Sequence, residues 1–62
     1  MRGQVVEVTL ARIGRETENA LLVETQDGRE IWLPFSTIDS ITHGDPPRVT
    51  IARWLAAKED LL

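Results

Sequence analysis

The chain has 62 residues, no cysteine, a single histidine and a formal net charge of −3 from ten acidic and seven basic side chains. This composition excludes disulfides and sites built from thiolates or several imidazoles, and it disfavours binding to duplex DNA, which normally needs a basic surface stripe. A chain of this length forms one domain, residues 1–62. Its core is small, and without disulfides or a metal site the remaining source of additional stability is self-association, so we expect a homo-oligomer.

The first predicted element is a half-buried strand in QVVEVTLARIG, residues 4–14, where apolar and polar residues alternate. The residues on its predicted inner face are Val6, Val8 and Leu10. The alternation then slips, because Ile13 rather than Arg12 takes the next inward position. We interpret the slip as a β-bulge near Ala11 or Arg12, of the kind that bends strands in small barrels.

The middle of the chain predicts a β-hairpin. A connection at residues 15–19 leads to a second strand at residues 20–26, and Asp27-Gly28 is a strong turn signal before a third strand at residues 29–34. A two-residue loop would place Leu22, Ile31 and Leu33 on one face. It would place Leu21, Val23 and Trp32 on the other, and a three-residue loop would shift this register.

Both faces of this hairpin carry large apolar residues in either register, and a small barrel has only one inside. The other face must therefore be covered by the C-terminal helix, by another subunit or by a ligand. We expect Ile31 and Leu33 to fill the barrel, and Trp32 to face outwards to a neighbouring subunit or a ligand.

The last third of the chain completes the predicted fold. Residues 36–39 predict one helical turn capped by Ser36, residues 39–47 are rich in turn formers, residues 48–52 predict a strand, and residues 53–62 predict a short helix. Strands spaced by about ten residues indicate a mainly β fold, a small SH3-like or OB-like antiparallel barrel of four or five strands with a short C-terminal helix. In the simplest arrangement the tail closes one end of the barrel with Trp54, Leu55, Leu61 and Leu62.

No motif for catalysis is present. Ser36 is expected as a cap, His43 lies in a glycine–proline turn, and no glycine-rich phosphate loop occurs. We therefore predict a protein that is not an enzyme, with no catalytic residues, metal or cofactor. The sequence has no apolar stretch of roughly 20 residues and no signal-peptide pattern at its start, so we expect a cytoplasmic protein with no membrane partner.

Arginine and tryptophan are the candidate binding residues, because guanidinium groups bind phosphates bidentately and indole rings stack on bases. The predicted ligand-binding or interface residues are Arg12, Arg15, Arg29, Trp32, Arg53 and Trp54. They would suit a small anionic ligand such as a nucleotide. The alternative is that the arginines only pair with nearby carboxylates such as Glu16, Glu18 and Glu30.

The segments RETENALLVE, WLPFS and VTIARWLAAKEDLL resemble small phage and prophage proteins with a RETEKA…W-x-P-K-S…WLA pattern, and the similarity runs from Arg15 to the end. This chain has Phe35 in place of a lysine, Ala52 in place of a proline and Glu59-Asp60 in place of lysine-glycine, so positive charge is lost. The resemblance implies a phage-encoded accessory protein of the host cytosol that sequesters a small anionic ligand such as a host defence signal. A protein–protein adaptor or inhibitor of a host enzyme, and a single-stranded nucleic-acid binder, are the alternatives.

Overall fold

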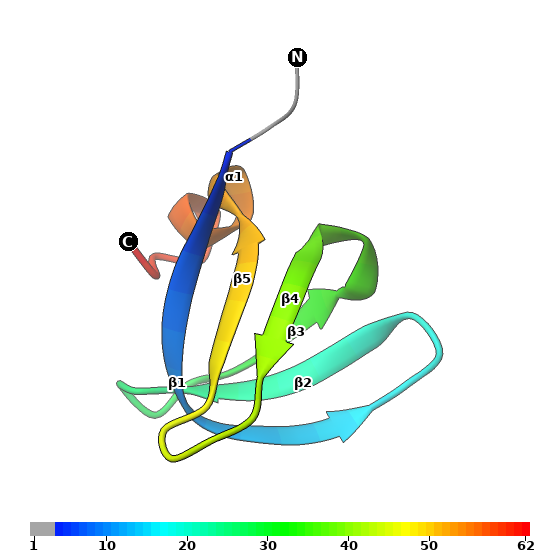
Figure 1. Ribbon diagram of the computed structural model, residues 1–62, viewed down its shortest axis with the longest axis vertical. Helices are drawn as coiled ribbons and strands as arrows, with labels where there is room; N and C mark the ends of the chain where they lie inside the picture. The colour runs from blue at the N-terminus through cyan, green and yellow to red at the C-terminus, as the bar shows by residue number, and fades with distance from the viewer. Residues whose placement is uncertain (1–3) are drawn as a thin grey trace.

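The computed structural model describes residues 4–62, so residues 1–3 of the predicted domain lie outside it, and it shows one five-stranded antiparallel sheet with one short helix (Figure 1). The elements are β1 (Val5–Glu16), β2 (Ala20–Thr25), β3 (Glu30–Pro34), the 3₁₀ turn η1 (Phe35–Thr37), β4 (Ile38–Thr42), β5 (Arg48–Ala52) and α1 (Arg53–Lys58). The strand order is β3-β2-β1-β5-β4. The predicted class, a small mainly β barrel of four or five strands with a short C-terminal helix, is confirmed.

The long strand β1 belongs to both halves of the sheet. Its first residues pair with β5, and from Leu10 onwards it pairs with β2. The β1–β2 ladder passes from Leu10↔Thr25 to Arg12↔Glu24, which makes Ala11 the extra residue of a bulge. The predicted bulge is therefore confirmed, and Figure 1 shows β1 curving where the two halves of the sheet turn towards each other.

The β2–β3 hairpin has a three-residue loop, so the two-residue loop expected from Asp27-Gly28 is wrong. The Thr25 N–H donates to the Arg29 carbonyl at 2.8 Å, and the Gly28 N–H donates to the Thr25 carbonyl at 3.0 Å. Gly28 has a φ of +90°, in the left-handed region that a three-residue hairpin loop needs at its last position. Glycine at position 28 therefore allows the backbone conformation that this three-residue loop requires.

The longer loop shifts the register of the hairpin by one residue. Leu21 pairs with Leu33, Leu22 with Trp32, and Val23 with Ile31. The faces expected from the shorter loop are therefore wrong for three residues of β2. Leu21 and Val23 lie on the inner face of the hairpin with Leu33, and Leu22 lies on the outer face with Trp32. The expectation that Leu33 is buried while Trp32 faces outwards is confirmed, because Leu33 is fully buried and Trp32 is 46% exposed.

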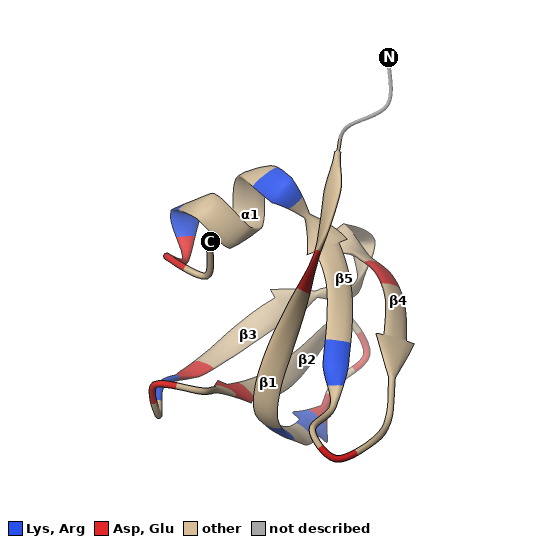
Figure 2. Cartoon of the chain, turned by 60° about the vertical axis from the view of Figure 1, so that its left-hand side comes forward, with Lys and Arg blue, Asp and Glu red and all other residues tan. Residues whose placement is uncertain are grey.

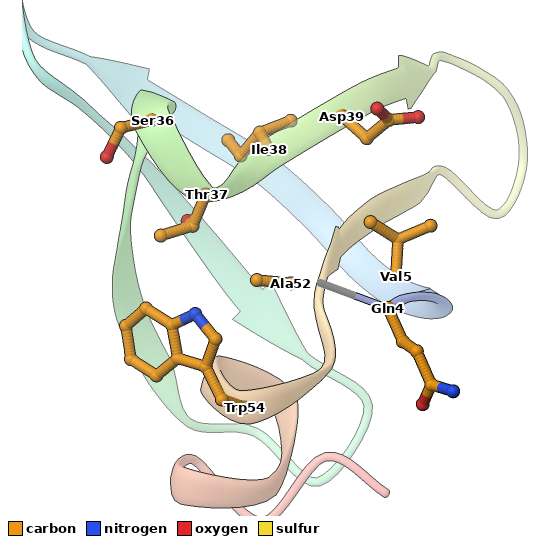
Figure 3. A pocket seen from close by; sticks show the side chains of 8 residues that line it. All are labelled: Gln4, Val5, Ser36, Thr37, Ile38, Asp39, Ala52 and Trp54. Atoms are coloured by element: carbon orange, nitrogen blue, oxygen red, sulfur yellow. The ribbon is translucent and has the colours of Figure 1, made fainter. Parts of the chain in front are cut away.

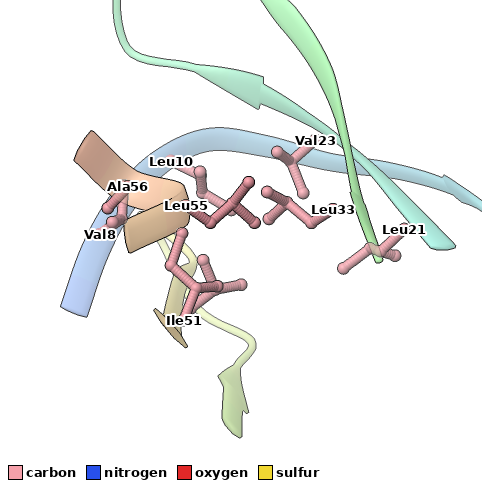
Figure 4. Packing of buried hydrophobic residues seen from close by; sticks show 9 residues of the cluster. Val8, Leu10, Leu21, Val23, Leu33, Ile51, Leu55 and Ala56 are labelled. Carbon is pink, nitrogen blue, oxygen red and sulfur yellow. The ribbon is translucent and has the colours of Figure 1, made fainter. Parts of the chain in front are cut away.

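A single aliphatic core lies between the two halves of the sheet and under the helix (Figure 4). Its buried residues are Val8, Leu10, Leu21, Val23, Leu33, Val49, Ile51, Leu55 and Ala56. The helix closes one end of this core with Leu55 and Ala56, and Leu61 packs against them. The predicted closure by the tail is correct for these residues and wrong for Trp54 and Leu62, which are both 61% exposed.

The connection between β3 and β4 also differs from expectation. Ser36 lies inside η1 and makes no capping hydrogen bond; instead the Thr37 hydroxyl donates to the Pro34 carbonyl at 2.6 Å. Part of the segment expected as a turn-rich connection is the edge strand β4, which pairs with β5. Its two isoleucines, Ile38 and Ile41, pack against the core, so the strand is held by burial on one face.

The helix α1 ends in a Schellman motif. The Asp60 N–H donates to the Ala57 carbonyl at 3.1 Å, and the Leu61 N–H donates to the Ala56 carbonyl at 2.7 Å. Asp60 has a φ of +62°, a conformation in which glycine is the favoured residue. The motif directs Leu61 back onto the core.

Candidate binding surfaces

The outer face of the β2–β3 hairpin presents an apolar pair to solvent. Leu22 and Trp32 are direct cross-strand partners, and the next pair on the same face is Ala20↔Pro34. In the other direction this face continues with Glu24↔Glu30. We call this surface the Trp32 face, and its residues are Leu22, Trp32, Pro34, Glu24, Glu30, Arg12 and Arg15. It combines an apolar centre with a charged border.

Arg12 lies at that border and pairs with both carboxylates. Its Nη2 atom lies 3.2 Å from the Oε1 atom of Glu24 and 4.0 Å from the Oε2 atom of Glu30, and its Nε atom donates to the same Glu24 oxygen. Arg15 and Arg12 line a hollow of about 210 Å³ together with Leu22 and these two glutamates. The alternative of pairing with carboxylates therefore holds for Arg12, although Glu24 is a partner that the sequence had not indicated.

Arg29 lies at the tip of the same hairpin and is also paired. Its Nε atom donates to the Oδ2 atom of Asp27 at 3.0 Å, and the Thr25 hydroxyl donates to the other carboxylate oxygen. The Thr25 hydrogen bond has the largest effect and, with smaller contributions from Arg29, holds the pKa of Asp27 below its ordinary value against the opposing effect of desolvation. Arg29 therefore stabilises the turn.

A second surface surrounds Trp54, at the start of α1. A groove of about 310 Å³ is lined by Gln4, Val5, Ser36, Thr37, Ile38, Asp39, Ala52 and Trp54 (Figure 3), and we call it the Trp54 groove. Figure 3 shows Trp54 at one end of the hollow and Asp39 at the other. The β4–β5 ladder passes from Ile38↔Ile51 to Ser40↔Thr50, so Asp39 is the bulged residue that supplies the only charged side chain in the lining.

Trp54 also borders a second hollow. This one has a volume of about 390 Å³ and is lined by Gln4, Arg53, Trp54 and Ala57. The Arg53 N–H donates to the Gln4 carbonyl at 2.8 Å, which ties the start of α1 to the segment before β1. Trp54 thus stands between a groove that contains a carboxylate and a hollow that contains a guanidinium.

The six predicted binding residues do not form one cluster. Arg12 and Arg15 share one hollow, Arg53 and Trp54 share another, Arg29 lies at the hairpin tip, and Trp32 lies on the outer face of β3. In Figure 2 the basic residues of the described chain are spread over β1, the hairpin, β5 and α1. Sequence reasoning missed Gln4, Thr37 and Asp39, because only the fold brings the start of β1, η1 and β4 together.

The described residues contain no group of three or more His, Cys, Asp or Glu side chains placed to hold a metal ion. Within residues 4–62, no helix has the length and apolar character that crossing a membrane requires. Comparison of the chain with protein-family models, with curated proteins and with solved structures found no match.

Proposed function

We propose that this protein is a non-enzymatic protein-binding module that assembles with a second copy of itself through the Trp32 face. The observation that carries the proposal is the exposed indole of Trp32 beside the partly exposed Leu22, on the outer face of the β2–β3 hairpin. Tryptophan is enriched among the residues that dominate binding energy at protein interfaces. The small core of a 62-residue chain gives assembly a second benefit, because it buries further apolar surface.

The charges of the Trp32 face favour a second copy as the occupant. Arg12 and Arg15 are matched there by Glu24 and Glu30, whereas the whole chain has a net charge of −3. A two-fold interface brings a patch against itself, so a patch of one sign would repel its copy. A patch with both signs lets an arginine of one copy meet a glutamate of the other.

Sedimentation equilibrium tests this assembly. The chain has a mass of 7.0 kDa, and we expect a species of at least twice that mass at micromolar concentration. Trp32→Ala should sediment as a folded monomer, whereas Trp54→Ala, which removes the more exposed of the two indoles, should assemble like the parent. A parent protein that is monomeric at micromolar concentration contradicts the proposal.

A second candidate function is the capture of a small anionic, nucleotide-like ligand at Arg53 and Trp54. Its support is that these two side chains line the same hollow, and that Arg53 takes part in no ion pair within 4.0 Å among the described residues. The resemblance to small phage and prophage proteins favours an accessory role such as sequestering a host signal. Titration calorimetry with a cyclic dinucleotide should give binding that weakens with salt and is lost in Arg53→Ala. Equal heats from the parent and the variant contradict it.

A further inference from the structure

The Trp54 groove carries an inference that deepens the proposed protein-binding role at a surface separate from the Trp32 face. We propose that this groove binds a single cationic side chain, arginine or lysine, presented by an extended segment of a partner protein. The cationic head meets Asp39, and the aliphatic stem lies along the groove towards Trp54. The inference rests on the proposed role as a protein-binding module, but it does not depend on self-association.

Charge complementarity selects a cation. Asp39 is the only charged residue among the eight that line the groove, and the chain as a whole is acidic. Asp39 is exposed and forms no ion pair within 4.0 Å in the described part of the chain, so its carboxylate is open to an incoming group. An anionic ligand would meet this carboxylate without a cation to offset it.

The shape of the groove selects a long side chain with an apolar stem. Val5, Ile38 and Ala52 give the middle of the groove an aliphatic lining, and Trp54 and Asp39 stand at its two ends (Figure 3). Arginine and lysine carry a charged head on an apolar stem, and their stems pack along apolar surface while the head stays hydrated. With the head at Asp39, the indole of Trp54 at the other end offers apolar surface to the stem.

The polar rim fits a peptide backbone. Gln4 and Ser36 also line the groove, and at its outer edge their amide and hydroxyl groups can hydrogen-bond to the N–H and C=O groups that flank a bound side chain. The bulge at Asp39 interrupts the regular pairing of the edge strand β4. Because bulges discourage the addition of a further strand, side-chain capture rather than sheet extension is the recognition mode that this edge favours.

The test uses the blocked tripeptide acetyl-Ala-Arg-Ala-amide, with a matched peptide in which citrulline replaces arginine and removes the charge at nearly constant shape. Titration into ¹⁵N-labelled full-length protein should shift the Trp54 indole N–H and the amides of Ser36, Thr37 and Asp39. We expect the arginine peptide to bind about two- to fivefold more tightly than the citrulline peptide, which is the range for one exposed ion pair. Asp39→Asn should remove that difference and leave the citrulline peptide unaffected.

Asp45→Asn is the matched control, because it changes the net charge equally at an exposed aspartate outside the groove and should leave the preference intact. Equal binding of both peptides by the parent, shifts that map to another surface, or an unchanged preference in Asp39→Asn each overturn the proposal. Sedimentation of the same samples reports assembly separately. A monomeric parent that still prefers the arginine peptide removes the Trp32 assembly and keeps the groove, and a dimer without the preference does the reverse.

Discussion

Leu33 and Trp32 are neighbours in the chain whose truncation should have different consequences. Leu33→Ala removes a fully buried side chain from the core, whereas Trp32→Ala removes a side chain that is 46% exposed on the outer face of β3. The first change leaves a cavity enclosed by other core residues. The second leaves a space open to solvent, where no enclosed cavity forms.

The magnitudes follow from burial. Truncation of a buried leucine to alanine destabilises by about 2–5 kcal/mol, and a domain of this size has a total stability of roughly 3–9 kcal/mol. Leu33→Ala should therefore leave the chain marginally folded or unfolded at 25 °C. Trp32→Ala should lower the free energy of unfolding by about 1–2 kcal/mol, because only part of the indole is buried within the chain. Stabilisation calculated from buried apolar area is also an upper limit.

Urea denaturation followed by circular dichroism measures both changes at several protein concentrations. If Trp32 also contacts a second copy, the midpoint of the parent should rise with protein concentration and that of Trp32→Ala should not. The assignment of the two faces would be refuted by a Trp32→Ala chain that is unfolded while Leu33→Ala retains the parent midpoint. A parent midpoint independent of concentration would refute the assembly alone.

Three further predictions concern the turns. Asp60→Gly should stabilise the fold by about 0.5–1 kcal/mol in thermal melts, because Asp60 adopts a left-handed conformation that glycine adopts without strain; a lower melting temperature would contradict the Schellman geometry. Gly28→Ala should destabilise by about 1–2 kcal/mol although nothing lies within 4 Å of the added carbon, since the φ of +90° is the obstacle; an unchanged urea midpoint would count against the three-residue loop. The pKa of Asp27 lies below its ordinary value of 3.8, so its ionised form stabilises the folded chain above that pH and the contribution is lost as the pH falls through the lowered pKa. Asp27→Asn should therefore show less loss of stability between about pH 5 and pH 2 in acid titrations, and an acid transition identical to the parent's would contradict this.

Local patterns predicted much of the fold, because the determining interactions lie within a few residues. The alternation from Val6 to Leu10 and its slip at Arg12 located both β1 and its bulge. The length of the hairpin loop was not predictable in the same way. It depends on a buried threonine, Thr25, whose hydroxyl accepts from the Arg29 N–H at 3.1 Å and donates to Asp27. A threonine at this place in a sequence has no feature that distinguishes it from a strand residue.

The strand β4 was missed for a different reason. Its sequence, IDSIT, contains only two apolar residues, and the bulge at Asp39 breaks the period-2 alternation that marks a strand. The Trp54 groove was missed along with it, since Asp39 is placed there by that bulge. Trp54 is one of the predicted binding residues. The groove beside it also contains Gln4 and residues of η1 and β4, and these lie far apart in the sequence.

The placement of the two tryptophans connects the fold to the proposed role. The buried core is entirely aliphatic, and both indoles lie outside it. A chain with so little core would gain stability by burying a tryptophan, so the exposure of 46% at Trp32 and 61% at Trp54 favours a use in binding over a use in folding. The charges near the two indoles differ. Balanced charges at the Trp32 face suit a self-complementary contact, whereas the lone carboxylate of the Trp54 groove cannot be satisfied by the same groove of a second copy. The difference in charge between the two surfaces is the reason for proposing two kinds of partner: a second copy at the Trp32 face and a basic segment of another protein at the Trp54 groove.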